Sequence, residues 1–188
     1  METKTETKAL VVVAEGSEEM ETVVVVDMLR RANITVTLAA LTVNPNHDYV
    51  TFSRNVKIVP DRYLEEIMDQ TDFDVFILPG GINGAKAFKT SKLIQNLLET
   101  YLKDETKLVA LLCAAPIALT PLTLQILAGK KITSHPSVKN QFDLNYYDYS
   151  EDRVVHDGNL ITSRGPGTSC EFSLKIIETL IGKHAAEA

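Results

Sequence analysis

The chain has 188 residues, of which 45% are hydrophobic and 23% charged, a balance typical of one globular domain with a sizeable core. Its net charge of -6, with no basic run longer than two residues, argues against partners such as nucleic acid or an anionic membrane. No apolar run is long enough to span a membrane, and residues 1–8 are polar and partly acidic, unlike a secretory or transit peptide. We therefore expect a cytoplasmic protein, with the nucleus and mitochondrion left open.

The two cysteines, Cys113 and Cys170, are predicted to be reduced thiols, because a chain without a secretion signal seldom carries a structural disulfide. Cys170 shares a helical spacing with Leu174, Ile177 and Ile181, which predicts a thiol in the core. Two cysteines and four scattered histidines show no metal-ligand spacing, so no metal site is expected.

Strands and helices are predicted to alternate along the chain, from residue 8 onward. Short, continuous apolar runs are typical of strands buried on both faces of a parallel sheet, and longer segments with turn residues at their ends indicate helices. The predicted strands are 8–14, 34–41, two short runs within 49–60, 73–78, 107–112, 131–134, and a hairpin of 153–155 with 160–163; the predicted helices are 17–33, 63–69, 91–103, one from residue 116, and one that follows 164–168 and ends before residue 182; loops are predicted at 42–48 and 79–84.

The first predicted helix contains four consecutive valines, which by propensity alone could form a strand. Its acidic first turn, its basic Arg30 and Arg31 in the last turn, and Asn33 as a C-cap favour a helix, with Ser17 as the N-cap candidate. Apolar residues cover nearly all of its sides, which indicates that something beyond its own sheet buries it, such as a second subunit.

This alternation predicts an α/β fold with a doubly wound, mainly parallel sheet and helices on both faces. We expect one domain over residues 8–188, preceded by a disordered tail at residues 1–7. Functional sites in such sheets lie beyond the carboxyl ends of the strands. Residues that follow predicted strands, and could therefore converge there, are Glu15, Gly16, Pro79 to Gly81, Cys113, His135 and Arg164.

Cys113 follows a buried strand and precedes two small residues and a proline, which resembles a nucleophile elbow. A helix N-terminus after the cysteine would favour a thiolate. The alternative is that Cys113 is a small apolar residue that closes a strand.

Glu21 shares a helix face with Val24, Val25 and Met28, so its carboxyl group is expected in an apolar setting that raises its pKa, as a proton shuttle requires. The alternative is a solvated carboxylate in the first turn of the helix. Gly80 and Gly81 could supply a backbone N–H that completes an oxyanion hole with the N–H of Ala114, although a plain strand-to-helix turn is equally consistent with them.

His135 is a candidate general base for Cys113, against the alternative of a polar surface residue before a proline. Binding of a dinucleotide is not indicated, because residues 16–19 lack the glycine series and place acidic groups where a pyrophosphate would lie.

Five ordered motifs, spanning roughly residues 8–182, resemble the ThiJ/PfpI superfamily and, within it, the parkinsonism-associated deglycase (DJ-one) branch. The motifs are residues 14–21, 78–81, 112–116, 134–137 and 162–168. The resemblance implies a flavodoxin-like fold and a homodimer whose first helix packs at the interface.

The resemblance also implies roles for particular residues. Cys113 would be the reactive thiolate, Glu21 its protonated partner, and the N–H groups of Gly81 and Ala114 the oxyanion site. Arg31 and Arg54 match family arginines near the interface and the site, and Arg164 lies in the last motif and is treated as a further candidate for binding an anion.

Members of this branch are described as converting α-oxoaldehydes such as methylglyoxal to hydroxy acids without glutathione, as removing early glycation adducts from proteins and nucleotides, and as sensing peroxide through oxidation of the cysteine to sulfinate. We therefore expect either a cofactor-free enzyme for reactive carbonyls or a non-catalytic redox sensor or chaperone. A cysteine protease is a poorer interpretation, since nothing places His135 beside Cys113.

The sequence departs from the family pattern at three places. Phe52 and Val59 stand where some members carry further cysteines, so regulation through such thiols is not expected. Ile82 replaces a polar residue after the glycine pair. The sequence stops at Ala188, short of the extra terminal helix that many members have.

Overall fold

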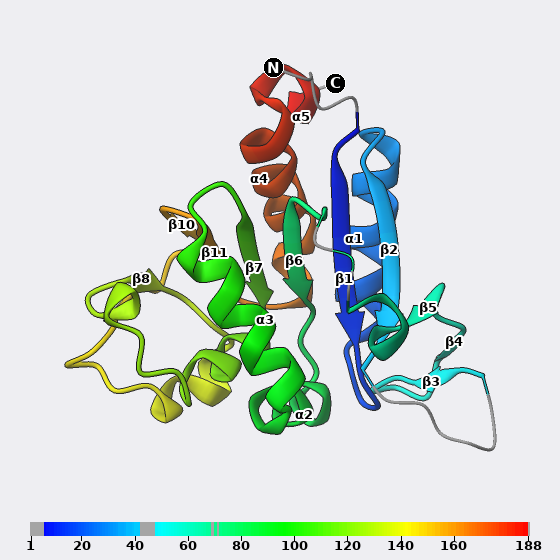
Figure 1. Ribbon diagram of the computed structural model, residues 1–188. Helices are drawn as coiled ribbons and strands as arrows, with labels where there is room; N and C mark the ends of the chain where they lie inside the picture. The colour runs from blue at the N-terminus through cyan, green and yellow to red at the C-terminus, as the bar shows by residue number, and fades with distance from the viewer. Residues whose placement is uncertain (1–5, 42–47, 69, 71, 188) are drawn as a thin grey trace.

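A seven-stranded sheet crosses the middle of the molecule, with the strand order β10-β11-β7-β6-β1-β2-β5 (Figure 1). Every neighbouring pair is parallel except β10 and β11, an antiparallel hairpin at one edge. This computed structural model describes residues 6–41, 48–68, 70 and 72–187. The strands of the sheet are β1 (Lys8–Val13), β2 (Thr35–Ala40), β5 (Arg62–Tyr63), β6 (Val75–Leu78), β7 (Leu108–Leu112), β10 (Val154–Asp157) and β11 (Leu160–Ser163).

Helices cover both faces of this sheet, so the predicted doubly wound, flavodoxin-like α/β fold is confirmed (Figure 1). α3 crosses the face toward the viewer, and α1 and α4 pack together on the far face. The α-helices are α1 (Glu19–Arg31), α2 (Ile82–Thr90), α3 (Lys92–Lys103), α4 (Ser169–Ile181) and α5 (Lys183–Glu187); the 3-10 helices are η1 (Leu64–Ile67), η2 (Ala115–Leu119), η3 (Gln125–Leu127), η4 (Pro136–Gln141) and η5 (Pro166–Thr168).

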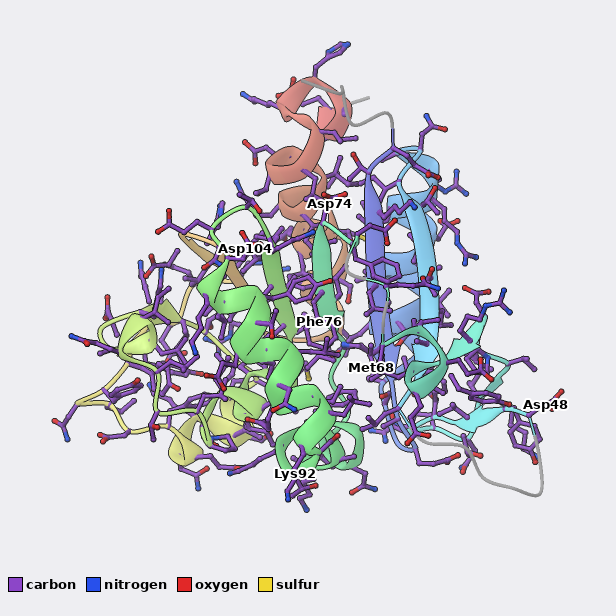
Figure 2. All side chains as sticks on the ribbon, viewed as in Figure 1. Asp48, Met68, Asp74, Phe76, Lys92 and Asp104 are labelled. Carbon is purple, nitrogen blue, oxygen red and sulfur yellow. The ribbon has the colours of Figure 1, made fainter. Side chains whose placement is uncertain are left out.

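The core lies between the sheet and these helices. All residues of β6 and β7 are buried, as a strand covered on both faces requires. Phe76 of β6 lies near the middle of the molecule beneath α3 (Figure 2), and its ring meets that of Tyr101 at a centroid distance of 5.6 Å. This packing positions the carboxyl ends of β6 and β7, and with them the loops that follow these strands.

Two small sheets lie outside the main one. β3 (Val50–Thr51) and β4 (Lys57–Ile58) form an antiparallel hairpin, which confirms the two short runs predicted within 49–60. β8 (Lys131–Ile132) pairs with β9 (Asp148–Tyr149) and not with the main sheet. The predicted strand at 131–134 is therefore shorter than expected and belongs to an outlying layer.

The first helix ends as predicted. It runs to Arg31, and Asn33 follows in the left-handed conformation with a φ of 58°. The predicted N-cap is wrong, however. The carboxylate of Glu18 caps the helix by accepting the N–H of Glu21 at 2.7 Å, while the hydroxyl of Ser17 accepts the N–H of Ala14 at 3.0 Å inside the turn.

The loop predicted at residues 79–84 is too long, because α2 already begins at Ile82. Gly84 and Ala85 are buried, and a Cβ on Gly84 would lie 2.7 Å from the hydroxyl of Ser17. The small residues that suggested a loop therefore allow a helix to pack closely against the β1–α1 turn. The helices predicted at 63–69 and from residue 116 are present as 3-10 helices, over residues 64–67 and 115–119.

The prediction that Cys170 is a core thiol is wrong: its side chain is exposed. Of the residues that share its spacing, Ile177 is buried, whereas Leu174 and Ile181 are 38% and 37% exposed. Cys170 therefore lies in the first turn of α4 at the border of the buried face. The apolar spacing identified a stripe that is only partly covered.

Several predictions concern the ends of the chain and the loop at residues 42–48. Residues 1–5 of the predicted tail and 42–47 of the predicted loop lie outside the described residues. The carbonyl of Thr7 accepts the N–H of Thr35 at 2.9 Å, so ordered pairing begins before Lys8. α4 ends before Gly182 as predicted, and the short α5 follows it. No helix within the described ranges has the length and apolar character to cross a membrane.

Candidate active site

The carboxyl ends of the parallel strands meet along one edge of the sheet, at the arrowheads of β1, β6 and β7 (Figure 1). Cys113 follows β7, Gly80 and Gly81 follow β6, and the turn that leads to Glu21 follows β1. These three strands are direct neighbours in the sheet. The convergence expected from the sequence is therefore found for these residues.

Cys113 occupies a strained backbone conformation, with a φ of 63° that residues other than glycine rarely adopt. Two hydrogen bonds from neighbouring segments hold it there. Its N–H donates to the carbonyl of Ser163 at 2.8 Å, and its carbonyl accepts the N–H of His135 at 2.7 Å. The predicted elbow geometry is thus present, and only 8% of the residue is exposed.

Glu21 projects from the first turn of α1 into this elbow. The residue is fully buried, and its Oε2 accepts the N–H of Gly80 at 2.6 Å. Its other oxygen, Oε1, has no nitrogen or oxygen partner among the described residues, and the carboxyl group interacts with the thiol of Cys113. The alternative of a solvated Glu21 is therefore excluded.

Gly80 lies where Cys113, Glu21 and Ala114 come close together. A Cβ at this position would lie 2.6 Å from the Cβ of Cys113, 2.6 Å from Oε2 of Glu21 and 3.0 Å from the nitrogen of Ala114. Only a glycine leaves room for these groups to meet. Because its own N–H is bonded to Glu21, Gly80 is not free to serve as an oxyanion donor, unlike Gly81.

Burial dominates the electrostatics of the pair. It raises the pKa of Glu21 to about 7, although the hydrogen bonds with Cys113 and Gly80 act in the opposite direction. Burial also raises the pKa of the Cys113 thiol, and an ionised Glu21 raises it further, whereas the N–H groups of Gly81 and Ala114 lower it. Above neutral pH the pair therefore holds one proton, and an ionised Glu21 opposes ionisation of the sulfur.

A helix does begin directly after Cys113, but it is η2, a 3-10 helix of five residues whose N-cap is Ala114. The backbone N–H of Ala114 lowers the pKa of the thiol, as expected of a helix N-terminus, and the N–H of Gly81 acts in the same direction. Burial and the charge of Glu21 outweigh both donors, so the pKa of Cys113 lies above its ordinary value. The two N–H groups are therefore the features of the site that favour a thiolate.

A raised pKa at Glu21 predicts that stability falls as the pH rises. The native state binds more protons than the unfolded state between the ordinary carboxyl pKa of 4.5 and the raised value of about 7. The contribution of Glu21 to the free energy of unfolding is therefore largest below pH 4.5 and decreases as the pH rises to about 7 and above. The total decrease is about 3 kcal/mol. The free energy of unfolding, measured by urea unfolding at pH 5 and pH 8, should decrease with pH in the wild type. It should not show this decrease in Glu21→Gln, because glutamine cannot ionise. An unchanged slope in the variant would contradict the assignment.

His135 reaches Cys113 through its backbone, not its imidazole. Its Nδ1 accepts the N–H of Ser137 at 3.2 Å and lies 2.8 Å from the hydroxyl of the same residue, so the ring caps η4. A Cβ on Gly165 would lie 3.4 Å from Cδ2 of the ring. With Nδ1 engaged in capping η4, this geometry gives the ring a structural role.

The three candidate arginines are all engaged by neighbouring groups. Arg31 donates to Asp27 at 2.7 Å on the exposed side of α1. The Arg54 guanidinium donates to the carbonyl of Ser53 at 3.2 Å. Arg164 donates to the carboxylate of Glu151, which also pairs with Lys139.

Two supporting residues were missed by the sequence reasoning. The carbonyl of Ser163 anchors the Cys113 peptide, and Glu18 caps the helix that carries Glu21. Nothing local marks Ser163, since its carbonyl acts through a neighbouring strand. Glu18 did carry a signal, because an acidic residue directly before a helix is a common cap. Within the described part of the chain, no three His, Cys, Asp or Glu side chains gather as metal ligands.

A doubly wound α/β fold with a cysteine at a strained elbow, facing a buried carboxyl group, defines a class of flavodoxin-like proteins with a thiol site at the sheet edge. Residues 7–179 match the DJ-1/PfpI family, and the chain belongs to that family.

Relatives of known name agree with this membership. The chain is 45% identical over 180 residues to the Parkinson disease protein 7 homolog of Danio rerio, covering 95% of this chain and 92% of the relative. It is 36% identical over 181 residues to the Glutathione-independent glyoxalase DJ-1 of Schizosaccharomyces pombe, covering 94% and 92%. The crystal structure of Drosophila melanogaster DJ-1beta matches with a TM-score of 0.88 and 45% identity, covering 97% of this chain and 95% of the other.

Proposed function

We propose that the protein is a cofactor-free, cysteine-dependent enzyme that converts small α-oxoaldehydes such as methylglyoxal to hydroxy acids and removes early glycation adducts from proteins and nucleotides. The observation that carries the proposal is the meeting of Cys113 and the buried carboxyl of Glu21 around Gly80. The name of the Schizosaccharomyces pombe relative, a glutathione-independent glyoxalase, supports the same reaction class.

The first step uses both groups of the pair. The sulfur of Cys113 forms a bond to the aldehyde carbon, and the carbonyl electron pair moves to oxygen, which takes the proton held by Glu21. The N–H groups of Gly81 and Ala114, which face the sulfur, are placed to stabilise negative charge at this point. The product is a hemithioacetal, with Glu21 now ionised.

Glu21 then moves a proton between adjacent carbons. Its carboxylate removes the C1 proton, which gives an enediolate with its negative charge at O2, and returns that proton to C2 while the O1 proton passes to O2. The result is a thioester of lactate on Cys113. Water attacks the thioester carbonyl, the carbon–sulfur bond breaks and lactate leaves, so the net reaction consumes one methylglyoxal and one water. No electron donor or cofactor is needed.

Lactate formation from methylglyoxal without glutathione tests the proposal. The wild-type chain should form lactate faster than buffer, and Glu21→Ala should lose most of this rate together with Cys113→Ser. Activity that survives in Glu21→Ala but not in Cys113→Ser would overturn the role of Glu21 as the proton shuttle. Lactate formation no faster than in buffer would overturn the proposed enzyme.

The second candidate function is a redox sensor or chaperone in which Cys113 is oxidised to sulfinate. A similar solved structure, Toxoplasma gondii DJ-1, is described as oxidized; it has 34% identity and a TM-score of 0.86. The same N–H donors that face the sulfur would bind sulfinate oxygens. Intact mass after mild peroxide treatment separates the two functions: ready gain of two oxygens with no methylglyoxal turnover favours the sensor.

A homodimer is the assembly that the exposed face of α1 favours. Met20 and Val23 are 57% and 53% exposed, although both are apolar. We expect light scattering to give twice the chain mass of 20.8 kDa for the wild type and the monomer mass for Val23→Glu, because a buried charge would oppose association. Leu144→Glu, at a residue 57% exposed elsewhere, is the matched control. A monomeric wild type would contradict this prediction.

A further inference from the structure

The turn between β1 and α1, residues 14–18, is held between two other segments. On one side it touches the glycine pair of the site: the N–H of Glu18 donates to the carbonyl of Gly80 at 3.0 Å, and a Cβ on Gly81 would lie 2.2 Å from the carbonyl oxygen of Gly16. Any shift of this turn would therefore displace the backbone beside Cys113.

On its other side the turn is bonded to the hairpin formed by β3 and β4, residues 50–58. The N–H of Gly16 donates to the carbonyl of Thr51 at 2.9 Å, and the N–H of Ser53 donates to the carbonyl of Ser17 at 2.8 Å. The hairpin has no pairing with the main sheet. Its position thus depends on the packing of Val50 and Phe52 into the core and on the bonds that attach it to the turn.

Two side chains add to that attachment: Oε2 of Glu15, which is exposed, accepts the N–H of Thr51 at 3.2 Å, and Glu19 makes the buried contacts. Glu19 is 92% buried, and its Oε2 accepts the hydroxyl of Ser53 at 2.7 Å while its Oε1 accepts the N–H of Arg54 at 2.7 Å. Burial alone would raise the pKa of Glu19, but the hydrogen bonds from Ser53 and from nearby backbone N–H groups outweigh it and leave this pKa below its ordinary value. Both oxygens are therefore occupied, and the group stays ionised at neutral pH.

Glu19 and Glu21 point to different sides of the same helical turn, since residues two apart on a helix differ by about 200° in direction. One carboxylate reaches the hairpin and the other reaches Gly80. The attachment made by Glu19 thus fixes the start of α1, and with it the place from which Glu21 approaches the thiol.

We propose that Glu19 is a positioning residue for the thiol site: by clamping the hairpin at Ser53 and Arg54 to the start of α1, it holds Glu21 and the glycine pair in the geometry that activates Cys113. The expected effect on lactate formation rests on the proposed function. The expected effect on the reactivity of the Cys113 thiol does not, because it can be measured without substrate turnover.

The test uses variants that keep the charge of the turn. Glu19→Asp retains the carboxylate but is one methylene too short to reach both partners, and Ser53→Ala removes one donor without touching the charge. Ser53→Thr restores the hydroxyl and serves as the rescue, and Glu65→Asp, the same substitution at an exposed glutamate of η1, is the matched control.

The readout is the rate of Cys113 alkylation by iodoacetamide as a function of pH, followed by intact mass with Cys170 replaced by serine. We expect Glu19→Asp and Ser53→Ala to alkylate about three- to tenfold more slowly at pH 7, with the midpoint moved upward, because a displaced glycine pair no longer directs the N–H of Gly81 at the sulfur, where it lowers the pKa of the thiol. Ser53→Thr and Glu65→Asp should match the wild type. If Glu19→Asp fails to fold, Ser53→Ala decides.

Lactate assays on the same variants should show a fall in kcat with little change in KM. Wild-type alkylation profiles in both Glu19→Asp and Ser53→Ala would overturn the positioning role, whatever their thermal stability. A wild-type chain that forms no lactate but whose alkylation profile shifts in these variants would overturn the proposed enzyme and leave the positioning role standing.

Discussion

Cys113→Ser should lower lactate formation from methylglyoxal by about a thousandfold, or about 4 kcal/mol of transition-state stabilisation. The substitution changes one atom, yet a serine hydroxyl is far less acidic than a thiol and Glu21 cannot ionise it. The loss should appear in kcat, because the shape of the site is nearly unchanged.

Cys170→Ser is the matched control for this variant, since it makes the same change at the exposed cysteine of α4. It should keep wild-type activity and lose only the second site of alkylation. Thermal unfolding should be similar for both variants. Equal loss of activity in the two, or residual turnover in Cys113→Ser at wild-type rate, would contradict the assignment of the nucleophile.

Gly81→Ala should destabilise the fold by about 3 kcal/mol, the largest expected effect on stability. Gly81 has a φ of 86°, which costs an alanine about 1 kcal/mol or more. In addition, the new Cβ would lie 2.2 Å from the carbonyl oxygen of Gly16 and 2.7 Å from the nitrogen of Glu18. Both are backbone atoms of the turn that carries α1, so relief of the clash requires the site itself to move.

Alanine substitutions at two other glycines separate the cost of the positive φ from the cost of the steric clash. Both are measured as changes in the free energy of urea unfolding. Gly129 has a φ of 75° and nothing within 4 Å of an added Cβ, so Gly129→Ala should show the backbone cost alone, about 1 kcal/mol. Gly167, equally open and without a left-handed φ, should tolerate alanine. Gly81→Ala no worse than Gly129→Ala would show that the turn yields easily and would weaken the argument that it holds the site.

Much of the fold followed from local patterns in the sequence. Continuous apolar runs placed β1, β6 and β7, because strands covered on both faces have no polar side to display. One error arose because small residues occur both in loops and at close contacts between elements. The glycines after β6 suggested a loop, but Gly84 instead allows α2 to pack against Ser17.

For the site, the sequence by itself determined which residues end the central strands and which carboxylate lies on an apolar helix face. Cys113 and Glu21 could be selected in this way, because burial follows from periodicity. The same reasoning failed for Cys170, because its apolar stripe on α4 is only partly covered: Ile177 is buried, but Leu174 and Ile181 are exposed.

Only the tertiary structure decided what each of these groups meets. The hydrogen bond from the N–H of Gly80 to Glu21 joins residues 59 positions apart. The pairing of Arg164 with Glu151 and the capping of η4 by His135 depend on how the loops at the carboxyl ends of the strands are folded. Such contacts are set by packing between distant segments, which no local spacing encodes. The balance of the pKa values at the thiol is decided at this level too, since burial and the direction of two N–H groups exist only in the folded chain.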